Sequence, residues 1–273
     1  MTRRQRFREE LVRHFGREPL EHADEVLRCR GTVCFAALAV HFGSTSPATL
    51  EARVDRRRPY ETVNGERTWS NIYRCWRRDG KLPSEKTVGH VWERTAGAVN
   101  LRRWRDLLLW ELLGPAPQIS VSPEERKKQF PPQIGRIIFR DVDLSSYYLK
   151  PFMCGPEQTL AVRNLRSLDA FLALLYLARQ AELIGDEPQH FLPAMCVFDL
   201  LPRVLYRYPQ LRYRWRALFV CIERILSRRL RENDAKPPVA FAVERVEAGL
   251  TLLLAKPDAA LDQVSDENWD WRR

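Results

Sequence analysis

Residues 68–92, TWSNIYRCWRRDGKLPSEKTVGHVW, combine aromatic and basic side chains with a central turn. Two tryptophans, one tyrosine, three arginines and one lysine occur within residues 68–81. Gly80 permits the left-handed backbone conformation that ends many helices. Pro83 opens the next segment, and Ser84 is suited to cap a second helix there. The stretch therefore predicts two short helices joined by a Gly-Lys turn.

The helical period of these two segments predicts which side chains face the core. Apolar residues three and four positions apart share one side of a helix, and that side packs inward. The side chains that this rule predicts to be buried are Ile72, Cys75, Trp76, Val88, Val91 and Trp92. The arginines of the first helix then face outward, with Trp69 and Tyr73 at the border.

This order of helix, Gly-Lys turn, Pro-Ser and helix resembles the helix-turn-helix DNA-binding domain of phage-repressor-type regulators, over residues 68–97. The resemblance implies three side chains at base edges: Ser70, Asn71 and Arg74. It implies three more near phosphates: Arg77, Arg78 and Lys81. Asn with adenine and Arg with guanine are the favoured pairings, each contributing about 1–3 kcal/mol of discrimination. The tryptophan-rich segment is also similar to uncharacterised bacterial proteins of mobile elements, a likeness that implies no activity.

The basic charge of the chain is concentrated around this motif. The net charge is +10, which favours a polyanionic partner, with nucleic acid first and an acidic membrane surface second. Residues 53–105 hold 14 Lys and Arg against 6 Asp and Glu. The complete set of predicted nucleic-acid contacts is Arg56, Arg57, Arg58, Trp69, Ser70, Asn71, Tyr73, Arg74, Arg77, Arg78, Lys81 and Lys86. A structural helical hairpin with a solvated basic face fits the same residues.

A second basic stretch, residues 203–231, interleaves arginines with Tyr206, Tyr208, Tyr213 and Trp215. Aromatic rings stack on bases while guanidinium groups hold phosphates, so this composition suits single-stranded nucleic acid. An amphipathic helix whose arginine stems lie along apolar surface would give the same pattern. The predicted second basic surface comprises Arg207, Arg212, Arg214, Arg216, Arg228 and Arg229.

The predicted fold class is mainly α, in two parts. Residues 1–114 are expected to form a basic helical domain that contains the helix-turn-helix-like hairpin, with helices at 19–29, 32–42 and 99–113. Prolines in residues 115–133 predict a linker. Residues 134–258 are expected to form a helical bundle with a short β element near its start, and residues 259–273 a tail. The bundle helices are expected at 158–183, 189–206, 212–233 and 238–255.

The chain carries no sequence motif of an enzyme that we recognise. It has no phosphate-binding glycine loop, no nucleophile elbow and no zinc-protease motif. His22, Cys29, Cys34 and His41 do not have the spacing of a zinc finger. We therefore expect no cofactor, no metal and no catalysis. Asp141 and Asp143 would share one face of a strand, which leaves a metal-dependent nuclease as a weaker alternative.

The expected function is DNA binding without catalysis, as a transcription regulator or as the DNA-binding subunit of a mobile-element or antiviral defence complex. DNA is favoured over RNA. The main alternative is an adaptor that binds another protein through its helical C-terminal half. No apolar segment follows the basic N-terminus and no apolar run approaches the roughly 20 residues of a membrane span. We therefore expect a cytoplasmic protein with no membrane partner.

Overall fold

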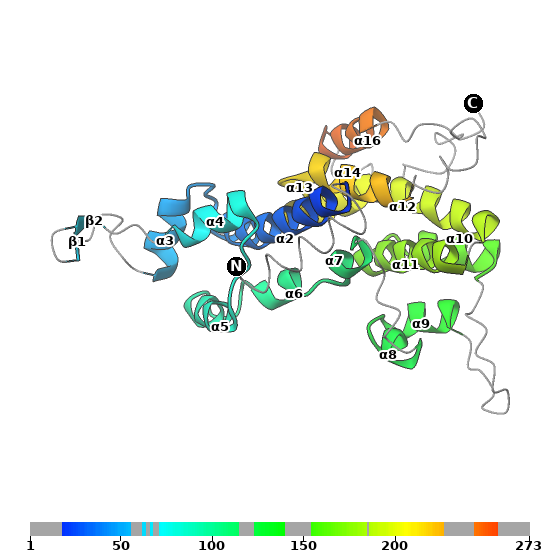
Figure 1. The fold of residues 1–273 in the computed structure, drawn as a ribbon, viewed down its shortest axis with the longest axis horizontal. Helices are drawn as coiled ribbons and strands as arrows, with labels where there is room; N and C mark the ends of the chain where they lie inside the picture. The colour runs from blue at the N-terminus through cyan, green and yellow to red at the C-terminus, as the bar shows by residue number, and fades with distance from the viewer. Residues whose placement is uncertain are drawn as a thin grey trace. The chain divides into compact units, whose positions relative to one another are not determined.

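A computed structural model describes residues 18–55, 62–63, 66–67, 71–114, 123–139, 154–184, 186–226 and 243–255. The chain divides into two compact units. The first comprises residues 1–118 and 209–225, and the second comprises residues 119–208 and 226–273. One division falls within the Pro-rich segment, but the return of residues 209–225 to the first unit was not foreseen. The fold is mainly α, as predicted (Figure 1).

The first unit is organised around α2 (Glu18–Phe42), a single helix of 25 residues. Its side chains from Val33 to Ala39 are all buried. Two helices, at 19–29 and 32–42, were predicted here, and that prediction was wrong. Gly31 does not interrupt the helix, although glycine in a helix interior costs roughly 1 kcal/mol relative to alanine.

Gly31 allows α2 to cross the predicted hairpin at close range. The hairpin consists of α4 (Ile72–Asp79), a turn, and α5 (Glu85–Arg94). A Cβ atom added at Gly31 would lie 2.8 Å from the Cα of Gly80, and one added at Gly80 would lie 2.8 Å from the Cα of Arg28. Since neither distance leaves room for a methyl group, the two backbones touch. Gly80 also has the predicted left-handed conformation, with φ of 68°.

The buried side of α4 differs from the prediction by one position. Tyr73 is 1% exposed and Trp76 is 1% exposed, whereas Ile72 is 39% exposed. The Tyr73 ring packs edge-to-face on Trp76, with 5.1 Å between ring centroids. Ile72 was predicted to be inward and is not, because the side of α4 that faces α2 is the one carrying Tyr73, Trp76 and Gly80.

The second helix of the hairpin follows the prediction more closely. Ser84 caps α5 by accepting a hydrogen bond from the backbone N–H of Thr87 at 3.2 Å. Val88 and Val91 are buried, as predicted, but Trp92 is 49% exposed. The Trp92 ring instead covers the turn after α5, where a Cβ added at Gly97 would approach it to 3.1 Å.

The rest of the first unit surrounds α2 and the hairpin. α3 (Pro47–Asp55) precedes β1 (Thr62–Val63) and β2 (Glu66–Arg67), two strands paired antiparallel. The helix predicted at 99–113 is two helices, α6 (Leu101–Arg105) and α7 (Leu108–Leu112). The Trp110 indole N–H donates to the carbonyl of Trp104 at 2.7 Å, which replaces a helical hydrogen bond at the break. α13 (Pro209–Arg212) packs on α2, and α14 (Trp215–Leu226) follows it.

The second unit is built on α11 (Leu168–Ile184) and α12 (Glu187–Arg207), which pack along each other. α10 (Pro156–Asn164) and α16 (Val243–Ala255) both pack on α12. α8 (Pro123–Lys128) and α9 (Pro132–Ile138) complete the described elements. Residues 134–138 are therefore helical where a β element was predicted, because consecutive prolines start a helix there. The helix predicted at 158–183 is interrupted by residues 165–167, between α10 and α11.

Within the described residues, no single helix combines the length and the apolar character of a membrane span. The stretch His22–Phe42 of α2 together with α3, bent by 70° at their junction, would pass on length and composition alone.

Candidate nucleic-acid interface

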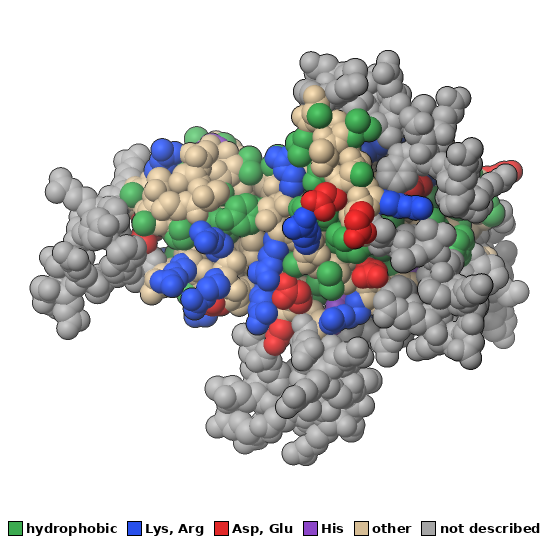
Figure 2. Space-filling view, turned by 90° about the horizontal axis from the view of Figure 1, so that it is seen from above, with side chains coloured by type: hydrophobic (Ala, Val, Ile, Leu, Met, Phe, Trp, Pro, Cys, Tyr) green, Lys and Arg blue, Asp and Glu red, His purple; other side chains and the backbone are tan. Residues whose placement is uncertain are grey.

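The outer side of α4 presents the exposed side chains of the predicted interface. Asn71, Arg74, Arg77 and Arg78 are all exposed, as is Lys81 in the turn that follows. Lys and Arg side chains gather at the end of the first unit that carries α3, α4 and α5 (Figure 2). The structure thus brings together the core of the predicted contact set. The remaining predicted residues of this region, Arg56, Arg57, Arg58, Trp69 and Ser70, lie outside the described residues.

α4 is held in place from its inner side. Besides the glycine crossing, the Thr32 hydroxyl of α2 donates to the carbonyl of Arg77 at 3.0 Å. That bond satisfies one of the carbonyl groups that the end of a helix leaves without an intrahelical partner. The Gly80 N–H donates to the carbonyl of Cys75 and closes the helix. The outer side chains therefore project from a helix whose C-terminal end is fixed to the core.

The arginines of α4 differ in how they are engaged. Arg77 donates to the carbonyl of Thr45 at 3.2 Å, and its guanidinium lies 5.9 Å from the centre of the Phe35 ring. Arg78 forms an ion pair with Asp79 at 2.9 Å, and this hydrogen bond lowers the pKa of the Asp79 carboxyl. Arg74 makes no hydrogen bond or ion pair with any residue that the structure describes. Its guanidinium is therefore the one on α4 most available to a ligand.

Tyr73 was predicted to contact nucleic acid, and that prediction was wrong. Its hydroxyl donates to Asp55 at the end of α3, at 3.4 Å. Burial, and then the nearby Asp55 carboxylate, raise the pKa of Tyr73. The tyrosine is therefore a core residue with a satisfied hydroxyl, and it cannot reach a ligand on the surface.

The same aspartate joins three helices of the first unit. His90 on α5 approaches Asp55 at 3.0 Å through its Nε2 atom. Asp55 thus contacts Tyr73 from α4 and His90 from α5. The hairpin is thus tied to α3 on this side by contacts from both of its helices.

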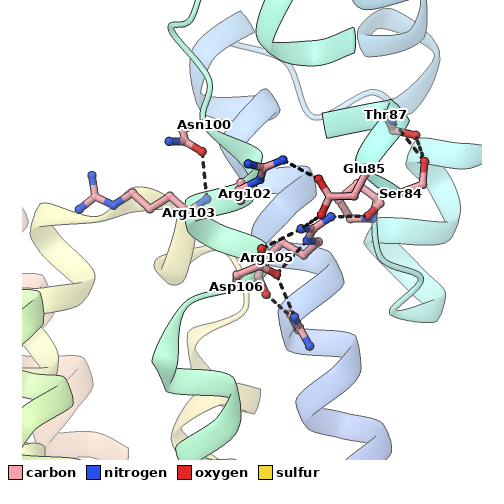
Figure 3. Close-up of polar contacts among 10 residues, drawn as sticks. Ser84, Glu85, Thr87, Asn100, Arg102, Arg103, Arg105 and Asp106 are labelled. Atoms are coloured by element: carbon pink, nitrogen blue, oxygen red, sulfur yellow. Dashed lines mark hydrogen bonds and ion pairs between the residues drawn. The ribbon is translucent and has the colours of Figure 1, made fainter. Parts of the chain in front are cut away.

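A charged network ties the turn of the hairpin to α6 and α2 (Figure 3). Glu85 accepts hydrogen bonds from Arg102 at 2.6 Å and from Arg105. Arg105 also binds Asp106 at 2.7 Å, and Asp106 in turn pairs with Arg30 at 3.3 Å. Hydrogen bonds from Arg105 and Arg102 lower the pKa of Glu85. The hydrogen bond from Arg105 lowers the pKa of Asp106.

This network uses some of the basic residues that follow the motif. The side chain of Arg105 is only 11% exposed and also donates to the carbonyl of Pro83 at 3.3 Å. The charge of Arg105 is therefore compensated by ion pairs within the fold. Lys86, by contrast, is exposed next to Glu85 and makes no ion pair with a described residue. Of these two basic residues, only Lys86 has an exposed charge that no described residue pairs with, and this charge could meet a polyanionic partner.

Part of the second basic stretch packs on α2. The Tyr213 ring lies edge-on to Phe35 of α2, with 5.8 Å between centroids, and Tyr213 is 39% exposed. Phe35 is the same ring that Arg77 approaches. Phe35 therefore contacts side chains from two separate segments, and this arrangement depends on the packing of residues 209–225 on α2.

The described residues of the predicted second basic surface belong to both units and have different partners. Arg214 pairs with Glu25 of α2 at 2.8 Å, and the Arg216 guanidinium lies 5.4 Å from the centre of the Trp215 ring. Arg212 is half-buried in the same unit. Arg207 belongs to the second unit, where it donates to the carbonyl of Arg166 at 3.0 Å. Arg228 and Arg229 lie outside the described residues.

The cysteines and the possible metal ligands of the described residues can be placed in the structure. No three His, Cys, Asp or Glu side chains gather there in a way that could hold a metal ion. Five of the six cysteines are buried. Burial raises the pKa of Cys34 to about 12 and that of Cys196 to about 12, so neither is a nucleophile at neutral pH. Asp141 and Asp143 lie outside the described residues.

The site is thus a short, anchored helix with an exposed polar and basic outer side. No family model matches the chain, and comparisons with curated proteins and with solved structures find no significant match.

Proposed function

We propose that the first unit binds nucleic acid, with double-stranded DNA favoured over RNA, and catalyses no reaction. The protein would act as a regulator or as the DNA-binding subunit of a mobile-element or defence complex. The observation that carries the proposal is the exposed side of α4, where Arg74 has no described partner while the helix itself is fixed to α2. A helix that is fixed to its domain and whose exposed side chains reach base edges is the usual means of reading the major groove.

The dimensions of α4 suit this task. An α-helix with its side chains is about 10–12 Å across, and the major groove is about 12 Å wide. Asn71, Arg74 and Arg78 recur at i, i+3 and i+7, so they form one row on the outer side. That row is about 10 Å long, or about three base-pair steps. Asn71 and Arg74 would read base edges, because an amide suits adenine and a guanidinium suits guanine.

The remaining cations would hold the backbone. Arg77 is anchored to the carbonyl of Thr45 and to the Phe35 ring, so it offers its other N–H groups from a fixed position. Lys81 and Lys86 project from the turn and from the start of α5. Such contacts position a protein on the duplex but carry no sequence information.

Fluorescence anisotropy with labelled double-stranded DNA, single-stranded DNA and RNA tests the class of partner. If Arg77, Arg78, Lys81 and Lys86 each meet a phosphate, log K should fall against log salt with a slope of about −3.6. Double-stranded DNA is expected to bind most tightly. The absence of binding to all three at about 50 mM salt would overturn the proposal. Tighter binding to a single strand would replace groove reading by stacking on Tyr213.

An adaptor function in the second unit is a second candidate, supported by one observation. Leu252 and Leu254 of α16 are 49% and 48% exposed, although each is a large apolar side chain. Protein-binding surfaces are marked by contiguous apolar patches, and these leucines would contribute to such a patch on α16. A stoichiometric protein complex that is lost in Leu254→Glu and kept in Arg74→Ala would favour this function. The nuclease alternative rests on Asp141 and Asp143 and predicts Mg²⁺-dependent cleavage that Asp141→Ala abolishes.

A further inference from the structure

The Trp92 ring on α5 has one face covered and one face open. A Cβ added at Gly97 would lie 3.1 Å from its Cζ2 atom, 3.3 Å from Cη2 and 3.5 Å from Cε2. These three ring atoms are consecutive, and an approach to the ring edge would leave the outer two markedly farther away than the middle one. The similar distances therefore place Gly97 against the face of the indole. Since Trp92 is 49% exposed, the opposite face is open to solvent.

The turn that supports the ring has an unusual backbone. Ala96 has φ of 48° and Gly97 has φ of 80°. A residue with a Cβ persists in the left-handed region only where its surroundings enforce it, and such residues cluster at functional sites. The Gly97 N–H donates to the carbonyl of Trp92 at 2.8 Å, which closes the turn on the residue whose ring it supports. The indole is thus a flat aromatic surface held in a defined position.

Gly89 leaves the surface beside the indole without a side chain. Residues three positions apart are neighbours on a helix, so Gly89 lies between Lys86 and Trp92 on α5. Glycine destabilises a helix interior relative to alanine. Packing does not require it here, because a Cβ added at Gly89 would have no neighbour within 4 Å. Gly31 and Gly80, by contrast, are required by the close crossing of α2 and the hairpin.

The two ends of this surface offer different chemistry. Lys86 is exposed and makes no ion pair with a described residue. It lies six residues before Trp92, or about 9 Å along the helix axis. An aromatic face stacks on any nucleobase, and an ammonium group binds phosphate as a point charge. A nucleotide carries a planar base and an anionic phosphate together, so its two parts match the two ends of the surface.

The charge around the surface also favours a polyanion. Residues 53–105, which include α5, hold 14 Lys and Arg against 6 Asp and Glu, a net charge of +8. On α5 itself, three charged side chains make no ion pair with a described residue: Lys86, Glu93 and Arg94. Their charges sum to +1, so the Glu93 carboxylate does not cancel the attraction for phosphate.

Given the nucleic-acid binding proposed above, on which this step rests, we propose that Lys86, Gly89 and Trp92 bind an unpaired nucleotide. Its base stacks on the open face of Trp92, and its phosphate meets Lys86 across Gly89. A base inside a duplex is stacked between its neighbours, whereas an unpaired base can be turned outward onto an aromatic ring. The protein therefore prefers a duplex that contains an unpaired nucleotide to one that is fully paired.

Fluorescence anisotropy of the full chain with three labelled DNA duplexes tests this preference. The duplexes share one sequence: one is fully paired, one carries a bulge of unpaired nucleotides, and one carries a bulge of abasic nucleotides. The abasic bulge keeps the phosphates and the flexibility but offers no base. We expect the bulge with bases to bind roughly tenfold more tightly than the paired duplex, and the abasic bulge to bind no more tightly than the paired duplex.

Two variants address the surface directly. Trp92→Leu keeps an apolar side chain but removes the flat ring, so it should abolish the tenfold preference. Gly89→Gln places a side chain between Lys86 and Trp92, and it should reduce the preference without harming the fold, because glutamine favours a helix more than glycine does. Val40→Gln replaces an exposed apolar side chain of α2 in the same unit and should keep the preference.

Equal affinities for the bulged and paired duplexes would overturn the proposal. So would a preference that the abasic bulge shares, or one that survives both Trp92→Leu and Gly89→Gln. A dimer of the protein that Trp92→Leu dissociates, with no effect of the bulge on affinity, would assign the ring to a contact between copies instead. Binding to the paired duplex that Arg74→Ala weakens, with no gain from the bulge, would overturn this proposal alone. The absence of binding to every nucleic acid would overturn the proposed function as well.

Discussion

The arginines of α4 in the first unit and those of α8 and α11 in the second unit differ in exposure. In the first unit, Arg74 and Arg78 stand exposed on the outer side of α4. In the second, Arg126 and Arg179 are 4% and 2% exposed, although they look no different in the sequence. Arg179 is paired with Glu182, and the Arg126 guanidinium lies 5.8 Å from the centre of the Tyr176 ring. A count of positive charges in the sequence therefore overstates the charge that the protein exposes to a partner.

The largest effect expected from this difference concerns stability. Arg179→Met leaves Glu182 without the partner it has in a mostly buried pair, so unfolding should become easier by about 3–4 kcal/mol. Arg78→Met removes an exposed pair with Asp79 and should leave the free energy of unfolding nearly unchanged. Urea unfolding followed by circular dichroism measures both. Similar values for the two variants would abolish the distinction between the units.

The second prediction concerns the packing of α4 against α2, not the exposed side chains on the outer side of α4. Gly80→Ala places a Cβ against the α2 backbone and at positive φ, so it should destabilise the protein by about 2–3 kcal/mol. Gly89→Ala in α5 is the matched control, because a Cβ there would have no neighbour within 4 Å. That control should stabilise the protein by about 0.5–1 kcal/mol. A neutral Gly80→Ala would show that the helices are not in backbone contact.

The Gly80 case also shows which features a sequence can predict. The left-handed end of α4, the Ser84 cap of α5 and the helical class of the chain follow from local signals, and all three were predicted correctly. The inward side of α4 was not, because Tyr73 and Ile72 are adjacent and similarly apolar. Their placement depends on the position of α2 and on Asp55, a partner distant in sequence.

The candidate site likewise has features that the sequence predicts and features that it does not. The exposed basic row of α4 could be inferred from helical spacing. The approach of Tyr213 to Phe35 could not, because it requires residues 209–225 to return to a unit formed by the start of the chain. A pocket of the second unit between α10, α12 and α16 was also not predicted, since its lining residues come from three separate segments and share no motif.

A smaller effect is expected from Arg102 and Arg105, which form ion pairs within the first unit. Arg105 and Arg102 lower the pKa of Glu85 below its ordinary value of 4.5, and Arg105 lowers that of Asp106 below 3.8. A carboxyl with a depressed pKa in the folded state contributes stability above its unfolded pKa and loses it as pH falls through the folded value. The free energy of unfolding should therefore decline between about pH 5 and pH 3.

The variant Glu85→Gln should make that acid-dependent decline shallower. Glu93→Gln, on the same helix and with no described ion pair, is the control and should leave the decline unchanged. Parallel pH profiles for the unchanged protein and Glu85→Gln, measured by urea unfolding at each pH, would contradict the role given to this network.

We propose that α4 reads base edges of DNA through Arg74, while Arg77 holds the phosphate backbone of the DNA. The most direct measurement selects a preferred duplex from random sequences and compares its affinity with that of random DNA, for Arg74→Ala and Arg77→Ala. Arg74→Ala should weaken the preferred duplex by about 1–3 kcal/mol more than random DNA. Arg77→Ala should weaken both duplexes alike. Equal losses for both variants on both duplexes would contradict base reading by α4.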